Sequence, residues 1–156
     1  MNFNNNLIEA HIFRETKGGI EFLLLKRSDK NVVYPGLWQM VNGKIKRGEK
    51  AYETALREIK EETGLVPIKL WTVPNVNLFY TPERDSVTIL PVFAARVKQN
   101  VKVIISNEHS DFQWLTPAKT KKKLAWSGQR KSVDLITRYF LTERKFFDLL
   151  AIKFQE

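Results

Sequence analysis

The sequence predicts a mixed α/β domain, in which a partly antiparallel sheet is layered against helices. Two observations carry this prediction. Several apolar segments typical of strands surround one segment with helical periodicity, residues 50–63, and further helical segments come near the end of the chain. The length of 156 residues and a hydrophobic content of 43% suit a single domain over residues 1–156 with a sizeable core.

The first elements are two strands joined by a short turn. Residues 7–14 and 20–27 are rich in apolar residues, and Lys17-Gly18-Gly19 between them indicates a hairpin. Residues 28–37 are predicted as a loop because Pro35-Gly36 interrupts them. A short apolar stretch over 38–41 then ends at Asn42-Gly43 and leads toward the helix.

The second half of the chain returns to strands and then to helices. Strands are expected at residues 68–81, 86–97, 102–105 and 112–115. Helices are expected from Pro117 to Leu124 and from Arg130 to Thr142, while the apolar tail 144–154 is compatible with packing on this domain or on a second subunit. The helix at 50–63 ends at Gly64, and Pro67 follows.

Composition excludes several classes of site. The chain has no cysteine and two histidines, which excludes disulfide frameworks, thiolate zinc sites and cysteine nucleophiles. No apolar run approaches the ~20 residues of a membrane span, and the first residues lack the pattern of a secretory signal, so we expect a cytoplasmic protein. The net charge of +9 suits either solubility or a polyanionic partner.

The helix at 50–63 carries the chemistry. Glu58, Glu61 and Glu62 fall on one face at i, i+3 and i+4, where like charges repel one another. They also lie near the helix C-terminus, where the helix dipole disfavours negative charge. A solvated acidic face would explain them, but a hard divalent cation would relieve the repulsion, because Mg²⁺ prefers carboxylate oxygens.

The segments around this helix favour the metal. Residues 43–48 form a basic loop bounded by two glycines, and such a loop can bring backbone groups and positive charge next to a phosphate. Glu49 stands at the helix start, and Arg57 lies within one turn of both Glu53 and Glu61, where it can pair with acids. Together these features predict a metal–phosphate site.

The pattern in residues 43–65 resembles the Nudix box, Gly-x5-Glu-x7-Arg-Glu-U-x-Glu-Glu-x-Gly-U, in which U is an aliphatic residue. Every fixed position matches, from Gly43 and Glu49 through Arg57-Glu58 and Glu61-Glu62 to Gly64-Leu65. The resemblance implies an α/β/α Nudix fold and hydrolysis of a substrate that contains a nucleoside diphosphate, with Mg²⁺ or Mn²⁺ as cofactor. The complete box disfavours a non-catalytic relative.

The resemblance also implies roles for individual residues. Glu58 and Glu62 would be the principal metal ligands, with Glu61 direct or through water, and a backbone carbonyl at Asn42 or Gly43 would complete the set. Glu49 and Arg57 would orient the loop and the helix. Among residues outside the box, Glu108 would be a general base or a further ligand, and Arg27 would contact the substrate phosphates, with Lys44, Lys46 and Arg47 as weaker candidates.

The sequence indicates the substrate less precisely than the type of reaction. Trp38 and Trp126 are candidates for stacking on a base, as are Phe79 and Tyr80, although each could equally be packing. Residues 126–130 resemble, more weakly, an element of the dihydroneopterin triphosphate pyrophosphohydrolases. We therefore expect pyrophosphate release from dihydroneopterin triphosphate or a (d)NTP by a monomer or homodimer.

The alternative is an RNA- or nucleic-acid-binding or processing protein on a Nudix fold. Its support is the net charge and the run of basic residues over 119–123. Such runs are more often solvated faces, so we expect a small-molecule substrate and neither a nucleic-acid nor a membrane partner.

Overall fold

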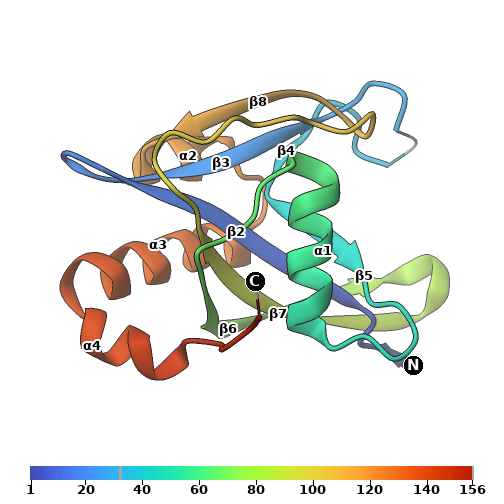
Figure 1. Ribbon diagram of the computed structural model, residues 1–156. Coiled ribbons are helices and arrows are strands. Elements are labelled where there is room, and N and C mark those ends of the chain that lie inside the picture. Colours follow the sequence, from blue (N-terminus) through green and yellow to red (C-terminus); the bar gives the residue numbers. More distant parts are fainter. Residues whose placement is uncertain (32, 156) are drawn as a thin grey trace.

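A mixed sheet lies between helices in the computed structural model, which describes residues 1–31 and 33–155 (Figure 1). Helix α1 (Ala51–Thr63) covers one face of the sheet. Helix α3 (Ser127–Thr142) covers the other face, with α2 (Pro117–Lys123) beside it. The predicted α/β/α architecture is confirmed, and no helix of the described residues is long and apolar enough to cross a membrane.

Strand β2 (Leu7–Thr16) lies at the centre of the sheet. It pairs antiparallel with β3 (Gly19–Arg27) and β5 (Val41–Lys44), and parallel with β7 (Ser86–Arg96). On one side of the sheet, β4 (Trp38–Gln39) and β8 (His109–Leu115) both pair antiparallel with β3. On the other side, β6 (Lys69–Thr81) pairs antiparallel with β7, and β1 (Asn2–Asn4) pairs parallel with β7. Among the pairings of the described strands, β2 with β7 and β1 with β7 are parallel and the others are antiparallel, which confirms the predicted partly antiparallel sheet.

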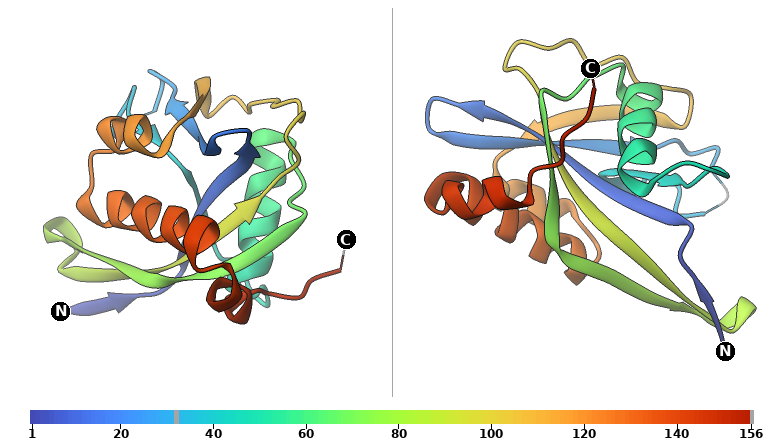
Figure 2. Two further views of the ribbon diagram at one scale, coloured as in Figure 1. Left: turned by 90° about the vertical axis from the view of Figure 1, so that its left-hand side faces the viewer. Right: turned by 60° about the horizontal axis from the view of Figure 1, so that its bottom comes forward.

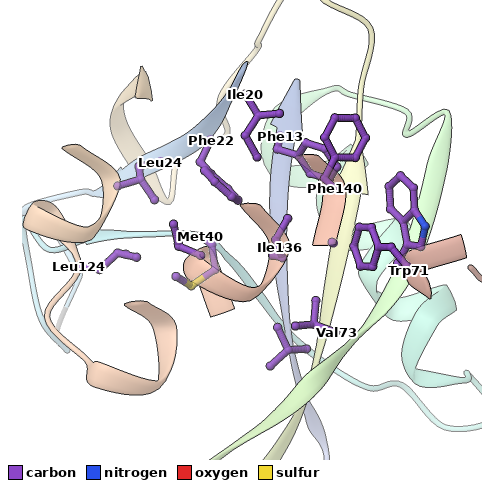
Figure 3. Close-up of a cluster of buried hydrophobic side chains, with 14 residues drawn as sticks. Phe13, Ile20, Phe22, Leu24, Met40, Trp71, Val73, Leu124, Ile136 and Phe140 are labelled. Carbon is purple, nitrogen blue, oxygen red and sulfur yellow. The ribbon is translucent and has the colours of Figure 1, made fainter. Parts of the chain in front are cut away.

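Each face of the sheet has its own hydrophobic core, because successive strand residues point to opposite sides. On β2, Ile8, Ala10 and Ile12 pack under α1, whereas Phe13 packs under α3. Figure 3 shows the second core, in which Phe13 meets Phe140 with ring centroids 5.0 Å apart. Both layers are thus anchored independently, and α1 is held rigidly against the sheet.

The box helix begins and ends as the sequence predicts. At its start, the Glu53 carboxylate accepts a hydrogen bond from the Lys50 N–H at 2.8 Å, which satisfies a donor that the helix leaves free. Glu53 therefore caps the helix and does not pair with Arg57, although their spacing would allow that pair. At its end, Gly64 adopts a left-handed conformation with φ 71°, and its N–H bonds to the Lys60 carbonyl at 2.9 Å.

The strand expected at residues 102–105 is wrong, since residues 101–106 pair with no strand. Their backbone groups bond instead to the end of α1. The Ile104 N–H donates to the Thr63 carbonyl at 2.9 Å and the Ser106 N–H donates to the Glu62 carbonyl at 3.3 Å. Carbonyls at a helix C-terminus have no partner within the helix, so the segment satisfies them and ends beside the acidic residues.

The C-terminal segment packs on its own domain. Helix α4 (Arg144–Phe147) and the 3-10 turn η2 (Asp148–Leu150) place the buried Phe147 ring parallel to Trp71, with centroids 4.6 Å apart. The Ile152 N–H also donates to the Leu70 carbonyl at 2.8 Å. Two elements start earlier than predicted: α3 starts at Ser127 rather than Arg130, and β8 starts at His109 rather than residue 112. Strand β1 was not predicted.

Candidate functional site

The acidic face of α1 is only partly a solvated face. Glu61 is about half exposed, whereas Glu62 is 5% exposed, next to the fully buried Thr63. The segment over residues 101–106 is bonded to the backbone at this point, since the Ser106 N–H donates to the Glu62 carbonyl. One oxygen of its carboxylate, Oε2, is buried with no hydrogen-bond partner. A buried carboxylate oxygen without a partner is costly, so packing alone does not explain Glu62.

Glu58 lies directly against the backbone of Gly43. A methyl group built on Gly43 would overlap the Glu58 Cγ atom, at a separation that real carbon atoms do not adopt. Strand β5 carries Gly43 and pairs with β2 opposite Ile8, so the sheet fixes this position. The invariant glycine of the box pattern thus has a physical reason here, because only glycine lets the acidic helix approach the strand.

Arg57 holds the helix and the preceding loop together. Its guanidinium donates to Glu49 at 2.7 Å, to Glu58 at 2.8 Å and to Glu61 at 3.3 Å, and also to the Lys44 carbonyl at 3.0 Å. Thr54 adds a bond to Glu49 at 2.6 Å. These bonds, above all those from Arg57, lower the pKa of Glu49 to about 2. The arrangement supports the positioning role expected for Arg57 and Glu49.

Burial and mutual repulsion keep the inner carboxylates from ionising easily. Burial, together with the negative charges of Glu58, Glu108 and Glu61, raises the pKa of Glu62 to about 9. Burial also raises the pKa of Glu58, although its bond to Arg57 opposes the shift. A site whose acids resist ionisation has a shortage of positive charge at its centre.

A divalent cation fits this shortage. Within residues 1–31 and 33–155, no three His, Asp or Glu side chains are already close enough together to hold a metal ion, and Glu58 is paired with Arg57. The donor chemistry nevertheless suits Mg²⁺: several carboxylates, a backbone carbonyl beside them, and the unpartnered oxygen of Glu62.

Two residues from outside the box are brought to the same place. The exposed Glu108 raises the pKa of both Glu58 and Glu62, whereas Arg27 lowers that of Glu62, so both charges lie near the buried acid. The Glu108 carbonyl accepts bonds from the Ser28 N–H at 3.0 Å and from the Asn31 side chain at 2.9 Å. These bonds tie the loop after β3 to the loop before β8, and the site lies where the two meet α1.

The aromatic candidates sit at different depths. Trp38 is half-buried against the core, with the Lys123 ammonium 4.6 Å from its ring centroid. Trp126 is exposed and forms an edge-to-face pair with Tyr34, with centroids 5.5 Å apart. Sequence reasoning missed Tyr34, because nothing local relates it to a residue some ninety positions away; its positive φ of 48° is visible only in the structure.

The lysine candidates Lys44 and Lys46 and the histidines have other contacts, and the Lys46 N–H donates to the Glu49 carboxylate at 3.1 Å. Lys44 contributes its carbonyl to Arg57, and its side chain is exposed. His11 is a satisfied core histidine, with its ring 3.3 Å from the buried Glu9 carboxylate. His109 is also buried and lies 3.2 Å from the Gln39 side chain. Burial first, and then the nearby Arg27, lowers its pKa to about 4, so it is neutral at pH 7.

Comparisons with known proteins agree with this geometry. Nucleoside triphosphatase NudI of Escherichia coli is 29% identical over 103 residues, which cover 62% of this chain and 73% of the relative. An octanoyltransferase of Myxococcus xanthus is 31% identical over 109 residues, 65% of this chain, and the match spans only 29% of that longer protein. The E. coli dihydroneopterin triphosphate pyrophosphohydrolase has the same fold, with a TM-score of 0.71 and 18% identity over 88% of this chain and 98% of that one.

The model of the NUDIX domain family matches residues 9–136 of this chain. The matched region runs from the central strand to the middle of α3 and therefore includes the whole acidic helix, both adjoining loops and Trp126. Because it covers well over half of the chain, the protein belongs to the NUDIX domain family and is a Nudix hydrolase.

Proposed function

We propose that this protein hydrolyses a phosphoanhydride bond of a nucleoside triphosphate-like substrate, with Mg²⁺ or alternatively Mn²⁺, and releases pyrophosphate and a monophosphate. The observation that carries the proposal is the buried Glu62 carboxylate, which has an oxygen without a partner and lies beside Glu58 on the box helix. The name of one relative, a nucleoside triphosphatase, supports the choice of substrate class.

Glu58, Glu61 and Glu62, together with the carbonyl of Gly43 or Asn42, would hold the cation. When bound, the cation supplies positive charge to the phosphate oxygens and lowers the pKa of water. The chain's own task is to keep these oxygens in position. Arg57 does so by bridging Glu58 to Glu49 and to the loop carbonyl of Lys44.

Glu108 is the residue we assign to proton transfer. It is exposed at the mouth of the site, its charge acts on Glu58 and Glu62, and its backbone is held by the loop after β3. A carboxylate in that place can accept a proton from an attacking water. Arg27 ends β3 on the same side and can neutralise charge that develops on the leaving pyrophosphate.

The exposed aromatic pair suggests where the base or pterin ring binds. Trp126 and Tyr34 are both exposed and pack edge to face, Tyr34 lies in the loop that follows Arg27 and β3, and Trp38 lies deeper. Aromatic side chains of this kind stack on flat heterocycles. We therefore propose dihydroneopterin triphosphate or a (d)NTP as substrate, and expect Trp126→Ala to raise KM with little change in kcat.

The test is release of pyrophosphate and orthophosphate in the presence of Mg²⁺ across a substrate panel. The panel holds dihydroneopterin triphosphate, the (d)NTPs, 8-oxo-dGTP, ADP-ribose and a dinucleoside polyphosphate. Glu62→Gln should lose at least about 100-fold in rate. The matched control, Glu53→Gln, removes the same charge from the same helix where it only caps the first turn, and should keep full activity.

Pyrophosphate from one triphosphate, lost in Glu62→Gln and kept in Glu53→Gln, is the expected result. Turnover that is equal in both variants would contradict the proposed site. No turnover of any substrate by the folded protein would favour the RNA-binding alternative, which salt-dependent RNA binding would then test. Two lysines of its basic run are already engaged: Lys121 pairs with Asp134 at 2.7 Å, and Lys123 covers Trp38.

A further inference from the structure

The hairpin formed by β6 and β7, together with β1, has one face that nothing in the described chain covers. Figure 2 shows this three-stranded ribbon extending beyond the helices that sandwich the rest of the sheet. The pairs Val76–Pro91, Leu78–Ile89 and Tyr80–Val87 lie directly opposite each other, so they share one face. Phe3 on β1 pairs with Val87 and joins them.

The two faces of the ribbon differ sharply in burial. On the side toward α3, Thr88 and Leu90 are buried, and Asn77 reaches the buried Glu9 with a hydrogen bond of 2.6 Å. Among the described residues of the hairpin, Phe79 near the tip is the one large apolar side chain of this side that is exposed. On the other side, the side chains of Phe3, Val76, Leu78 and Tyr80 are 53–71% exposed. We call these four residues, with Val87, Ile89 and Pro91 between them, the apolar ribbon face.

The apolar ribbon face is larger than scattered surface residues would make it. With 150–250 Å² for an aromatic side chain and somewhat less for an aliphatic one, the four most exposed residues present about 500 Å² of contiguous apolar surface. The half-buried Val87, Ile89 and Pro91 enlarge it. A stable interface takes about 800 Å² from each partner, so the four exposed residues supply more than half of that area, and Val87, Ile89, Pro91 and the rim of the face must supply the rest.

The charges around the face decide what kind of partner fits. From Leu70 to Thr81 and from Ser86 to Ala95 the hairpin has no charged residue, although the chain as a whole carries +9. A nucleic acid or an anionic membrane needs basic residues at the contact, and the hairpin tip instead has Glu83 and Asp85 around Arg84. The partner must therefore be uncharged, apolar and nearly flat.

We propose that the apolar ribbon face is the interface of a homodimer, in which two copies pack ribbon against ribbon about a twofold axis. A second copy supplies a face of the same area, shape and neutrality, as an isologous interface requires. Sheets that pack face to face lie ~10 Å apart and interdigitate their side chains. Leu78, in the middle of the β6 row, becomes buried in this arrangement.

The dimer leaves the acidic site accessible. The site is formed by the C-terminal half of α1 and the loops that adjoin it, whereas the ribbon face is formed by β1 and the distal parts of β6 and β7. None of the residues placed in the site belongs to the ribbon face, and Tyr80, a stacking candidate in the sequence, lies on the ribbon face instead. Dimerisation can therefore be tested without affecting hydrolysis, and the failure of one proposal would leave the other standing.

The experiment is sedimentation equilibrium of the full chain over a concentration series, in low salt and in 1 M NaCl. The wild type should sediment with twice the chain mass of 18.2 kDa, and high salt should not dissociate it because the interface is apolar. Leu78→Lys should be a monomer. The matched control is Leu149→Lys, at a leucine in η2 that is 80% exposed and outside the ribbon face, and it should remain a dimer.

Thermal unfolding and hydrolysis assays show that each variant is folded. A wild type that stays monomeric at the highest concentration would overturn the proposal, and so would a folded Leu78→Lys that remains a dimer. Dissociation by Leu149→Lys but not by Leu78→Lys would place the interface on the C-terminal segment instead. If Leu78→Lys does not fold, the milder Val76→Ser replaces it, and its dimer should dissociate at least tenfold more readily.

Discussion

Replacing Glu62 by glutamine should make the metal-free protein more stable while it removes activity. The Glu62 carboxyl is 5% exposed, and its Oε2 atom has no partner. Burial and the charges of Glu58, Glu108 and Glu61 raise its pKa to about 9, from 4.5 in an unconstrained chain. Glutamine has nearly the same shape and no charge to desolvate, so it does not lose the folding free energy that burying the Glu62 carboxylate costs.

The magnitude follows from proton linkage. Because the folded pKa is above the unfolded one, the folded protein holds a proton at Glu62 between pH 4.5 and 9 that the unfolded chain has released. Stability is unaffected below pH 4.5 and falls by about 1.36 kcal/mol for each pH unit above it. At pH 7 the penalty is about 3 kcal/mol, so Glu62→Gln should gain about 1–3 kcal/mol, allowing for incomplete relief.

Urea unfolding in EDTA at pH 5, 7 and 8 measures this gain. The advantage of Glu62→Gln should be small at pH 5 and grow with pH, while Mg²⁺ should stabilise the wild type more than the variant. Glu61→Gln is the control, because that carboxylate is about half exposed. The reasoning is refuted if Glu62→Gln is less stable than the wild type in EDTA at pH 7, or if the difference does not change with pH.

Two further predictions concern the backbone of the site and the C-terminal segment. Gly43→Ala should lower activity about 10- to 100-fold in the pyrophosphate assay, because the new methyl group must displace Glu58. Gly18→Ala is the control and should keep full activity, because its new methyl group would have nothing within 4 Å. Equal losses of activity in the two variants would contradict the role of the close Gly43–Glu58 contact. Asp148→Asn should cost about 0.5 kcal/mol at pH 7, because it breaks an exposed ion pair with Lys69. That pair lowers the pKa of Asp148, so its contribution is present above the ordinary pKa of 3.8 and is lost as the pH falls below it. In urea unfolding the difference should be present at pH 7 and shrink as the pH is lowered from 3.8 through the lowered pKa of folded Asp148, and a difference that does not shrink in acid would refute the ion-pair origin.

Elements that follow local periodicity could be predicted from the sequence. The box helix, the first hairpin and the long strands β6 and β7 lie within one or two residues of their expected bounds at nearly every end. The segment at 102–105 could not be predicted, because its composition suits a strand, and only the nearby end of α1 offers its backbone other partners. The short β1 was missed because its pairing with β7 joins residues far apart in the chain.

For the site, the spacing of the box residues determined by itself that three carboxylates share a helix face and that a glycine precedes them. Tertiary structure decided how these groups differ. It buried the Glu62 side chain, brought Glu108 and Arg27 near it, and paired Tyr34 with Trp126. Helical spacing is local and can be read from the sequence, whereas desolvation and contacts between distant loops depend on how the layers close around each group.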